Sequence, residues 1–356
     1  MPRSGHRRSA TLRGRVVSLT GGLSSGSAIA MIDVTVAIPT YNRKELLRAT
    51  IESVLQQEDV NFELIVCDNA STDGTPEVVE SIGDSRLRVI RSPTNVGLIA
   101  NFNRALASGT APFVTVLHDD DLLRPKSLAL RSELLRSDDA MVVAYSDYGV
   151  IDEHGVRTRD VFRTRVPSGS IEQPLEYLRA ALLGEVRCHM SAALIRRSLL
   201  RAVQCYEEDG SFTDHGLWMR LACNGSFGLL PLALTDVRVH ASAGSTMGNF
   251  GLDENGVVVP FATEQVVRTL CVARRVLRDP NLDIPNRNRL RMRAEVEATR
   301  QIGRAVGADL AVAGTSLSGV VGRAVRAVPA AAFNLAVLRA AGVRVRDRLR
   351  AVRNRS

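Results

Sequence analysis

Short runs of β-branched and apolar residues alternate with amphipathic segments between residues 32 and 150. Between the runs, segments such as Lys44–Gln57 carry apolar residues at helical spacing. Strands that alternate with helices predict a mostly parallel sheet covered on both faces, because each crossover lays a helix against the sheet. We therefore expect an α/β fold. The runs predicted to be strands are residues 33–38, 63–67, 86–90, 113–117 and 141–146.

Three of the predicted strands end in polar loops. The first strand stops at Pro39, and its loop covers residues 39–43; the other two loops cover residues 68–73 and 118–121. The carboxyl ends of parallel strands lie along one edge of a sheet, and ligands of open α/β sheets bind outside that edge. We expect the three loops to line one crevice.

The third loop, His118-Asp-Asp-Asp121, places three carboxylates in a row. Burying them costs several kcal/mol per charge unless a cation compensates. A hard divalent cation such as Mg²⁺ or Mn²⁺ would relieve the repulsion, and such ions often share their coordination with substrate phosphates. The alternative is a solvated acidic turn ahead of a helix that begins near Pro125.

Several other classes of site are excluded. The chain has no Walker-type phosphate loop, no Gly-x-Gly-x-x-Gly after the first strand and no Gly-x-Ser-x-Gly elbow. Its five Cys residues are scattered, without a Cys-x-x-Cys pair, which argues against zinc ribbons and thioredoxin-like sites and fits a reducing cytosol. No apolar stretch reaches the roughly 20 residues that a membrane-spanning helix needs.

Four motifs in order closely resemble the family 2 glycosyltransferases. This resemblance covers about residues 32–245 and implies a GT-A fold, with a Rossmann-like, mostly parallel sheet flanked by helices. It also implies inverting transfer of a sugar from a nucleotide-diphosphate donor (UDP, dTDP or GDP) to an acceptor hydroxyl. The motifs are Val36-Ala-Ile-Pro-Thr-Tyr-Asn-Arg43, Asp68-Asn-Ala-Ser-Thr-Asp-Gly-Thr75, Asn95-Val-Gly-Leu98 and Leu117-His-Asp-Asp-Asp121.

The resemblance implies roles for individual residues. His118 stands where many members have a first Asp, so the ribose contact is assigned to Asp119. The expected ligands of a divalent metal, Mn²⁺ or Mg²⁺, are Asp120, Asp121 and His240. The residues expected to contact the nucleotide sugar are Pro39, Thr40, Tyr41, Asp68, Asn95, Asn103 and Asp119.

An inverting transferase also needs a base for the acceptor hydroxyl. Asp214 begins a predicted helix ahead of Trp218 and resembles the second acidic motif of the family, which implies Asp214 as this base. A helix N-terminus favours an ionised carboxylate. The alternative for Asp214 is a helix cap, and Trp218 fits either an acceptor wall or the core.

The later part of the chain has a mixed pattern. It predicts a helix over 172–183, strands at 190–195, 227–230 and 233–239, a mobile loop over 241–258, and helices from residue 260 onward. We expect a GT-A domain at 32–258, with a nucleotide-binding half at 32–150 and an acceptor half at 151–258. A helical C-terminal extension with a basic tail is expected at 259–356.

Positive charge is concentrated at the two ends. Residues 1–31, expected to be a disordered extension, contain five Arg and no acid, and residues 323–356 contain nine Arg and one acid. A basic amphipathic tail would suit contact with anionic lipid. We expect a cytoplasmic enzyme, peripheral at the inner face of the membrane, with no nucleic-acid partner.

The expected acceptor is a cell-surface polysaccharide, a lipid-linked glycan or a glycosylated metabolite. Two alternatives stay open at this point. A nucleotidyltransferase on a similar sheet would need a Gly-rich basic first loop, whereas this loop is Pro39–Arg43. A non-catalytic protein that binds membrane or nucleic acid through its basic ends is the other alternative.

Overall fold

The structure is a computed structural model of the 356-residue chain. The predicted extension at residues 1–30 and the chain from residue 295 onward lie outside the described residues. The described residues are 31–162, 171–172, 176–182, 188–200, 203–205, 213–239, 250–252, 258–260, 270–284, 286–292 and 294.

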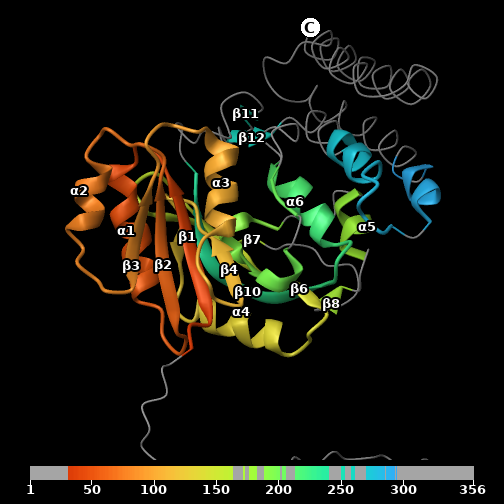
Figure 1. Cartoon of the computed structure of the whole chain (residues 1–356), viewed down its shortest axis with the longest axis horizontal. Coiled ribbons are helices and arrows are strands. Elements are labelled where there is room, and N and C mark those ends of the chain that lie inside the picture. The colour runs from red at the N-terminus through yellow and green to blue at the C-terminus, as the bar shows by residue number, and fades with distance from the viewer. Residues whose placement is uncertain are drawn as a thin grey trace, which may run out of the picture. The chain divides into compact units, whose positions relative to one another are not determined.

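The first half of the chain forms the parallel part of the sheet (Figure 1). β1 (Val34–Thr40) lies between β2 (Phe62–Asp68) and β4 (Phe113–Val116), and β3 (Leu87–Arg91) pairs with the far side of β2. All three pairings are parallel, as the alternation of strands and helices predicts. The carboxyl ends of these strands therefore lie at one edge.

The second half extends the sheet with mixed pairings. β9 (Ala193–Arg196) runs antiparallel to both β4 and β6 (Met141–Ile151). β10 (Ser226–Arg238) runs parallel to β6, and β5 (Leu122–Leu123) pairs antiparallel with β10. The strand order is β3-β2-β1-β4-β9-β6-β10-β5. Two further strands, β7 (Arg157–Phe162) and β8 (Ile171–Glu172), pair antiparallel with β6 and β10.

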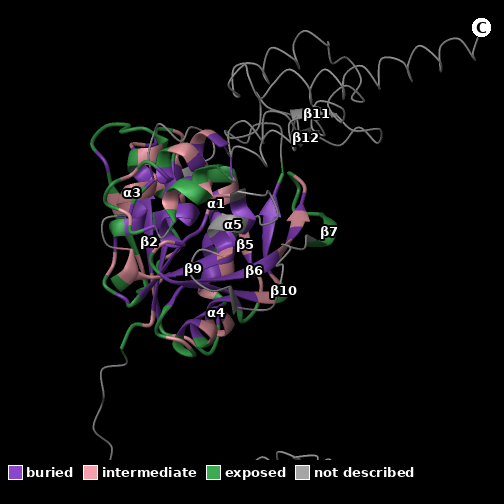
Figure 2. Cartoon of the chain, turned by 90° about the vertical axis from the view of Figure 1, so that its right-hand side faces the viewer, coloured by how far each residue is buried: buried purple, intermediate pink, exposed green. Residues whose placement is uncertain are grey.

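Helices cover both faces of the sheet, whose strands are largely buried (Figure 2). One apolar cluster joins the sheet to α1 (Lys44–Leu55), α2 (Thr75–Glu80) and α4 (Ser127–Arg136). The other joins it to α3 (Leu98–Ala107), α5 (Glu176–Leu182) and α6 (Thr213–Leu221). The predicted mostly parallel α/β sheet with flanking helices is confirmed.

The first strand does not stop at Pro39 as expected. It continues through Thr40, which pairs with Asp68 of β2. The ladder between β1 and β4 ends at Ala37, so the missing N–H of Pro39 leaves no ladder bond to β4 unmade. Pro39 marks the point where β1 separates from β4.

Other predicted elements differ in detail. Residues 190–192 form a short 3₁₀ turn before β9, and the strands expected at 227–230 and 233–239 are one strand, β10, whose pairing with β6 shifts register. The loop expected over 241–258 contains β11 (Phe250–Leu252), which pairs with β12 (Val258–Pro260). In the predicted C-terminal extension, residues 270–276 and 287–292 are helical. None of the helices within the described ranges is both long and apolar enough to cross a bilayer.

Candidate active site

Hydrogen bonds join the first two strand-end loops. The Asn42 amide N–H donates to Ser71 Oγ at 2.9 Å, and the Thr72 N–H donates to Asn42 Oδ1 at 2.9 Å. Asn42 adopts a positive φ of 54°, which Asn tolerates better than most residues. The third loop approaches the first, with Arg43 Nε 3.9 Å from Asp119 Oδ1. The convergence of the three loops is therefore present in the structure.

Asp68 and Asn69 organise the loop at the end of β2. Asp68 is 2% exposed; it accepts from the Ser71 N–H at 3.1 Å and pairs with Arg91 Nε at 3.3 Å. Asn69 donates to Asn95 Oδ1 at 2.8 Å and accepts from the backbone N–H of Val96. Two Asn side chains thus fix the loop that leads into α3.

The other residues expected near the nucleotide occupy different environments. Pro39 and Thr40 are buried at the end of β1, whereas Tyr41 is 44% exposed. Asn103 on α3 exchanges two hydrogen bonds with the backbone of Cys205, at 2.9 and 2.8 Å. Its amide therefore holds the segment around Cys205, and its nucleotide contact remains a prediction.

The acidic loop lies in an environment that disfavours ionised carboxylates. Burial, followed by repulsion from Asp120, raises the pKa of Asp119 to about 6, although the Thr40 hydroxyl and Arg43 oppose the shift. Asp121 is 1% exposed, and burial raises the pKa of its carboxyl as well. Excess negative charge in a partly buried loop is the situation that a bound cation relieves.

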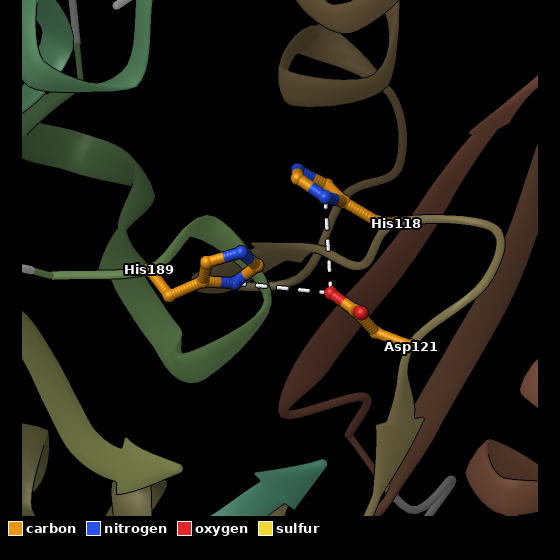
Figure 3. Close-up of side chains that lie close together, drawn as sticks. All are labelled: His118, Asp121 and His189. Carbon is orange, nitrogen blue, oxygen red and sulfur yellow. Dashed lines mark ion pairs between the residues drawn. The ribbon is translucent and has the colours of Figure 1, made fainter. Parts of the chain in front are cut away.

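Two imidazoles face Asp121 (Figure 3). Oδ2 of Asp121 lies 3.7 Å from Nδ1 of His118 and 3.8 Å from Nδ1 of His189. The three ligand atoms lie within 4.8 Å of one another, and Nδ1 of His189 is buried without a hydrogen-bond partner. Burial, followed by the neighbouring His118, lowers the pKa of His189 to about 3. A carboxylate with two imidazoles is a donor set that suits a divalent transition metal.

A buried polar network supports Asp121 from behind. Ser191 Oγ donates to Asp121 Oδ2 at 2.5 Å and accepts from the His118 N–H at 3.1 Å. Arg238 on β10 donates its backbone N–H to Asp121 Oδ1 at 2.8 Å. Arg131 of α4, with no exposed surface, donates to the Ser191 carbonyl, and burial lowers its pKa to about 10. Ser191 and the backbone of β10 therefore hold the carboxylate in place, and Arg131 supports Ser191.

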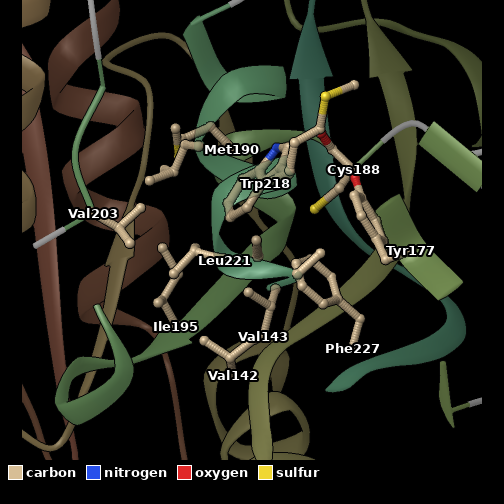
Figure 4. Packing of buried hydrophobic residues seen from close by; sticks show 14 of the residues in the cluster. Val142, Val143, Tyr177, Cys188, Met190, Ile195, Val203, Trp218, Leu221 and Phe227 are labelled. Carbon is tan, nitrogen blue, oxygen red and sulfur yellow. The ribbon is translucent and has the colours of Figure 1, made fainter. Parts of the chain in front are cut away.

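Asp214 lies in the first turn of α6, as predicted, and is half-buried. Its Oδ1 accepts from the His215 N–H at 2.9 Å, and its charge is close enough to His189 to affect that imidazole. Trp218, one turn later, has no exposed surface and donates to the Cys188 carbonyl at 3.0 Å (Figure 4). Trp218 is therefore a core residue and not an acceptor wall.

His240 lies outside the described residues, so its expected role as a metal ligand remains a prediction. Sequence reasoning missed His189, Ser191 and Asn69. His189 and Ser191 precede a short strand in a segment without a recognisable motif, and only the pairing of β9 with β4 brings them to the acidic loop. Asn69 stands inside the second motif, directly after a predicted strand, and that position was the available signal; the structure shows the residue to be buried.

Comparisons with known proteins identify the family of the chain. Residues 35–203 match the family described as Glycosyl transferase family 2. The Bacillus subtilis protein EpsE, named as a glycosyltransferase, is 30% identical over 217 residues, which are 59% of this chain and 74% of EpsE. The chain belongs to glycosyl transferase family 2. This membership selects the glycosyltransferase interpretation over the two alternatives.

A second sequence relative and a solved structure are also similar to this family 2 member. An Escherichia coli protein named as the UDP-Glc:alpha-D-GlcNAc-diphosphoundecaprenol beta-1,3-glucosyltransferase WfaP is 25% identical over 61% of this chain and 80% of its own length. The crystal structure of Staphylococcus aureus TarS 1–349 matches with a TM-score of 0.59 at 18% identity. That match covers 85% of this chain and 82% of TarS 1–349, and it shows the GT-A fold.

Proposed function

We propose that this family 2 enzyme transfers a sugar, with inversion, from a nucleotide-diphosphate sugar to a hydroxyl of a lipid-linked glycan during synthesis of a cell-surface polysaccharide. The observation that carries the proposal is the meeting of three strand-end loops with the start of α6. There Asp121 lies 3.8 Å from His189, whose imidazole is also close enough to Asp214 to be affected by its charge. WfaP, whose name specifies a UDP-sugar donor and a diphosphoundecaprenol acceptor, supports the choice of substrates.

The reaction is a single displacement at the anomeric carbon. Asp214 takes the proton of the acceptor hydroxyl, the acceptor oxygen bonds to the anomeric carbon, and the bond to the diphosphate oxygen breaks on the opposite face. Asp68 and the loop fixed by Asn69 and Asn95 bind the nucleoside, and Asp119 contacts its ribose. Inversion requires that the base and the leaving group act on opposite faces of the sugar.

The residues present fit a divalent cation. Asp120 and Asp121, with His240, would hold it beside the donor diphosphate. The raised pKa values of Asp119 and Asp121 are what uncompensated charge in a partly buried loop produces. When bound, the cation would neutralise the charge that develops on the departing nucleoside diphosphate.

The base assignment is tested by Asp214→Asn. We expect transfer to be lost, because an amide cannot accept the hydroxyl proton, while affinity for the nucleoside diphosphate stays within about twofold. Transfer is measured with radiolabelled donor, after a thermal-shift screen of UDP-, GDP- and dTDP-sugars with Mn²⁺ has identified that donor. Asp152→Asn makes the same change at a turn after β6 and serves as the control, which should transfer the sugar like the wild type. Normal turnover by Asp214→Asn would remove Asp214 from the mechanism.

A further inference from the structure

Two histidines that the proposed function leaves without a role converge on the acidic loop. His118 follows β4, and His189 precedes the 3₁₀ turn (Met190–Ala192) that leads into β9. Their Nδ1 atoms lie 3.7 and 3.8 Å from the same oxygen, Oδ2 of Asp121 (Figure 3). We infer that His118, Asp121 and His189 together form a metal site that prefers a borderline transition-metal ion to Mg²⁺.

The two imidazoles are held in place by further ring contacts. The His118 and His189 centroids are 5.1 Å apart at an interplanar angle of 61°. Phe102 of α3 packs edge-on against His118 with centroids 5.5 Å apart, and Tyr148 of β6 packs against His189 at 5.4 Å. Ligands whose rings are already oriented lose little conformational freedom on binding.

The carboxylate is oriented as well. Ser191 Oγ and the Arg238 N–H each donate to one oxygen of Asp121, so both oxygens are anchored. Hydrogen bonds of this kind orient metal-ligating carboxylates. His189 supplies a buried nitrogen with no hydrogen-bond partner, and this nitrogen faces the anchored oxygen. A ligand atom without another partner is available for a metal.

The chemistry of the donor set decides which metal fits. Mg²⁺ prefers oxygen ligands and keeps much of its water, whereas imidazole suits Zn²⁺, Co²⁺ and, more weakly, Mn²⁺. With two nitrogen donors and one carboxylate, the site discriminates against Mg²⁺. The inference rests on the proposed function and deepens it, since it adds His118 and His189 to the expected ligands of the metal beside the donor and names the class of that metal.

The test measures metal binding by the full chain without any sugar donor. Electron spin-echo measurements on the Mn²⁺-loaded wild type detect ¹⁴N nuclei bound to the metal. We expect nitrogen modulation, and we expect it to weaken in both His118→Ala and His189→Ala. Each variant should bind Mn²⁺ and Co²⁺ about tenfold more weakly or worse, by calorimetry. His154→Ala, at an exposed turn position, is the matched control and should bind like the wild type.

Two results would overturn the inference. One is a wild-type spectrum without nitrogen modulation, a result that does not depend on how well any variant folds. The other is modulation that disappears in His240→Ala but persists in both His118→Ala and His189→Ala. Sugar transfer is assayed separately: absent transfer with intact nitrogen modulation counts against the proposed function and supports the metal site.

Discussion

At Ser191 one hydroxyl connects the acidic loop to the segment before β9. It donates to Asp121 and accepts from the His118 N–H, while the Ser191 carbonyl accepts from buried Arg131 and from Thr235. Asp121 also faces the imidazoles of His118 and His189 at 3.7 and 3.8 Å, and burial lowers the pKa of Arg131 to about 10. Ser191 is small, and it contributes to stability because it lies between the buried groups of Asp121 and Arg131.

Ser191→Ala should therefore destabilise the protein. The substitution removes a donor from a carboxylate that stays buried, so we expect the free energy of unfolding to fall by about 1–3 kcal/mol. Urea unfolding followed by circular dichroism measures the change. Ser137→Ala removes an exposed hydroxyl that bonds only to the Leu134 carbonyl. Equal effects of the two substitutions would contradict the role given to Ser191.

At the scale of elements, Asp236 joins β10 to β7 and to the segment after β5. It lies on β10 and accepts from Arg124, which follows β5, at 2.6 Å and from Arg157 of β7 at 3.0 Å. Burial alone would raise the pKa of Asp236, but the hydrogen bonds from Arg124 and Arg157 outweigh it and lower the pKa. The ionised form is thus favoured by folding.

This shift gives the stability a defined pH dependence. Because the folded-state pKa is below the ordinary value of 3.8, the stabilisation is present above that pH and is lost as the pH falls through the folded-state value. Asp236→Asn should cost about 1–3 kcal/mol at pH 7 and progressively less below pH 4. Unfolding curves across this range test the expectation. Asp160→Asn, at a highly exposed partner of Arg157, should change little at any pH.

Gly109 connects α3 to β4 in a turn that excludes side chains. Its φ is +76°, and an added Cβ would lie 2.3 Å from Thr35 Oγ1 and 2.6 Å from Glu63 Oε1. Gly83 has a similar φ of +66° but nothing within 4 Å. Gly109→Ala and Gly83→Ala should share the backbone strain of about 1 kcal/mol, and only Gly109→Ala should add a steric cost. Thermal unfolding of both variants separates the two terms; equal losses would contradict the close approach at Thr35.

The elements of the parallel half could be read from the sequence because each strand and helix there is defined by local periodicity and ends at a polar loop. Asp119–Asp121 were placed correctly at a strand end for the same reason. His189 could not be found this way, because its position depends on the antiparallel pairing of β9 between β4 and β6. Long-range pairing of short strands leaves no periodic pattern in one sequence. The Pro39 error had a local cause: a proline in a strand is tolerated where the neighbouring ladder has already ended.

At the scale of the whole molecule, the excess of positive over negative charge is concentrated in two terminal segments that lie largely outside the described residues. Residues 323–356 hold nine Arg and one acid. If this tail brings the enzyme to a lipid-linked acceptor, full-length protein should co-sediment with anionic liposomes more than a 1–322 chain does. The attraction should weaken in high salt because the charges are screened.

A full-length variant with the tail Arg residues replaced by Gln controls for chain length, and neutral liposomes control for surface charge. We expect both to reduce sedimentation to the level of the 1–322 chain. Equal binding of anionic liposomes by the full-length and 1–322 chains would remove the tail from membrane attachment.

The sole tryptophan of the sequence gives the molecule a built-in optical reporter. Trp218 is sealed in the core, and its indole N–H is bonded to the carbonyl of Cys188, the residue immediately before His189. Its emission should be blue-shifted in the folded enzyme and should respond to any ligand that moves the Cys188–His189 backbone. Ligand binding near the acidic loop can then be followed in real time by fluorescence, without a label and without an engineered residue.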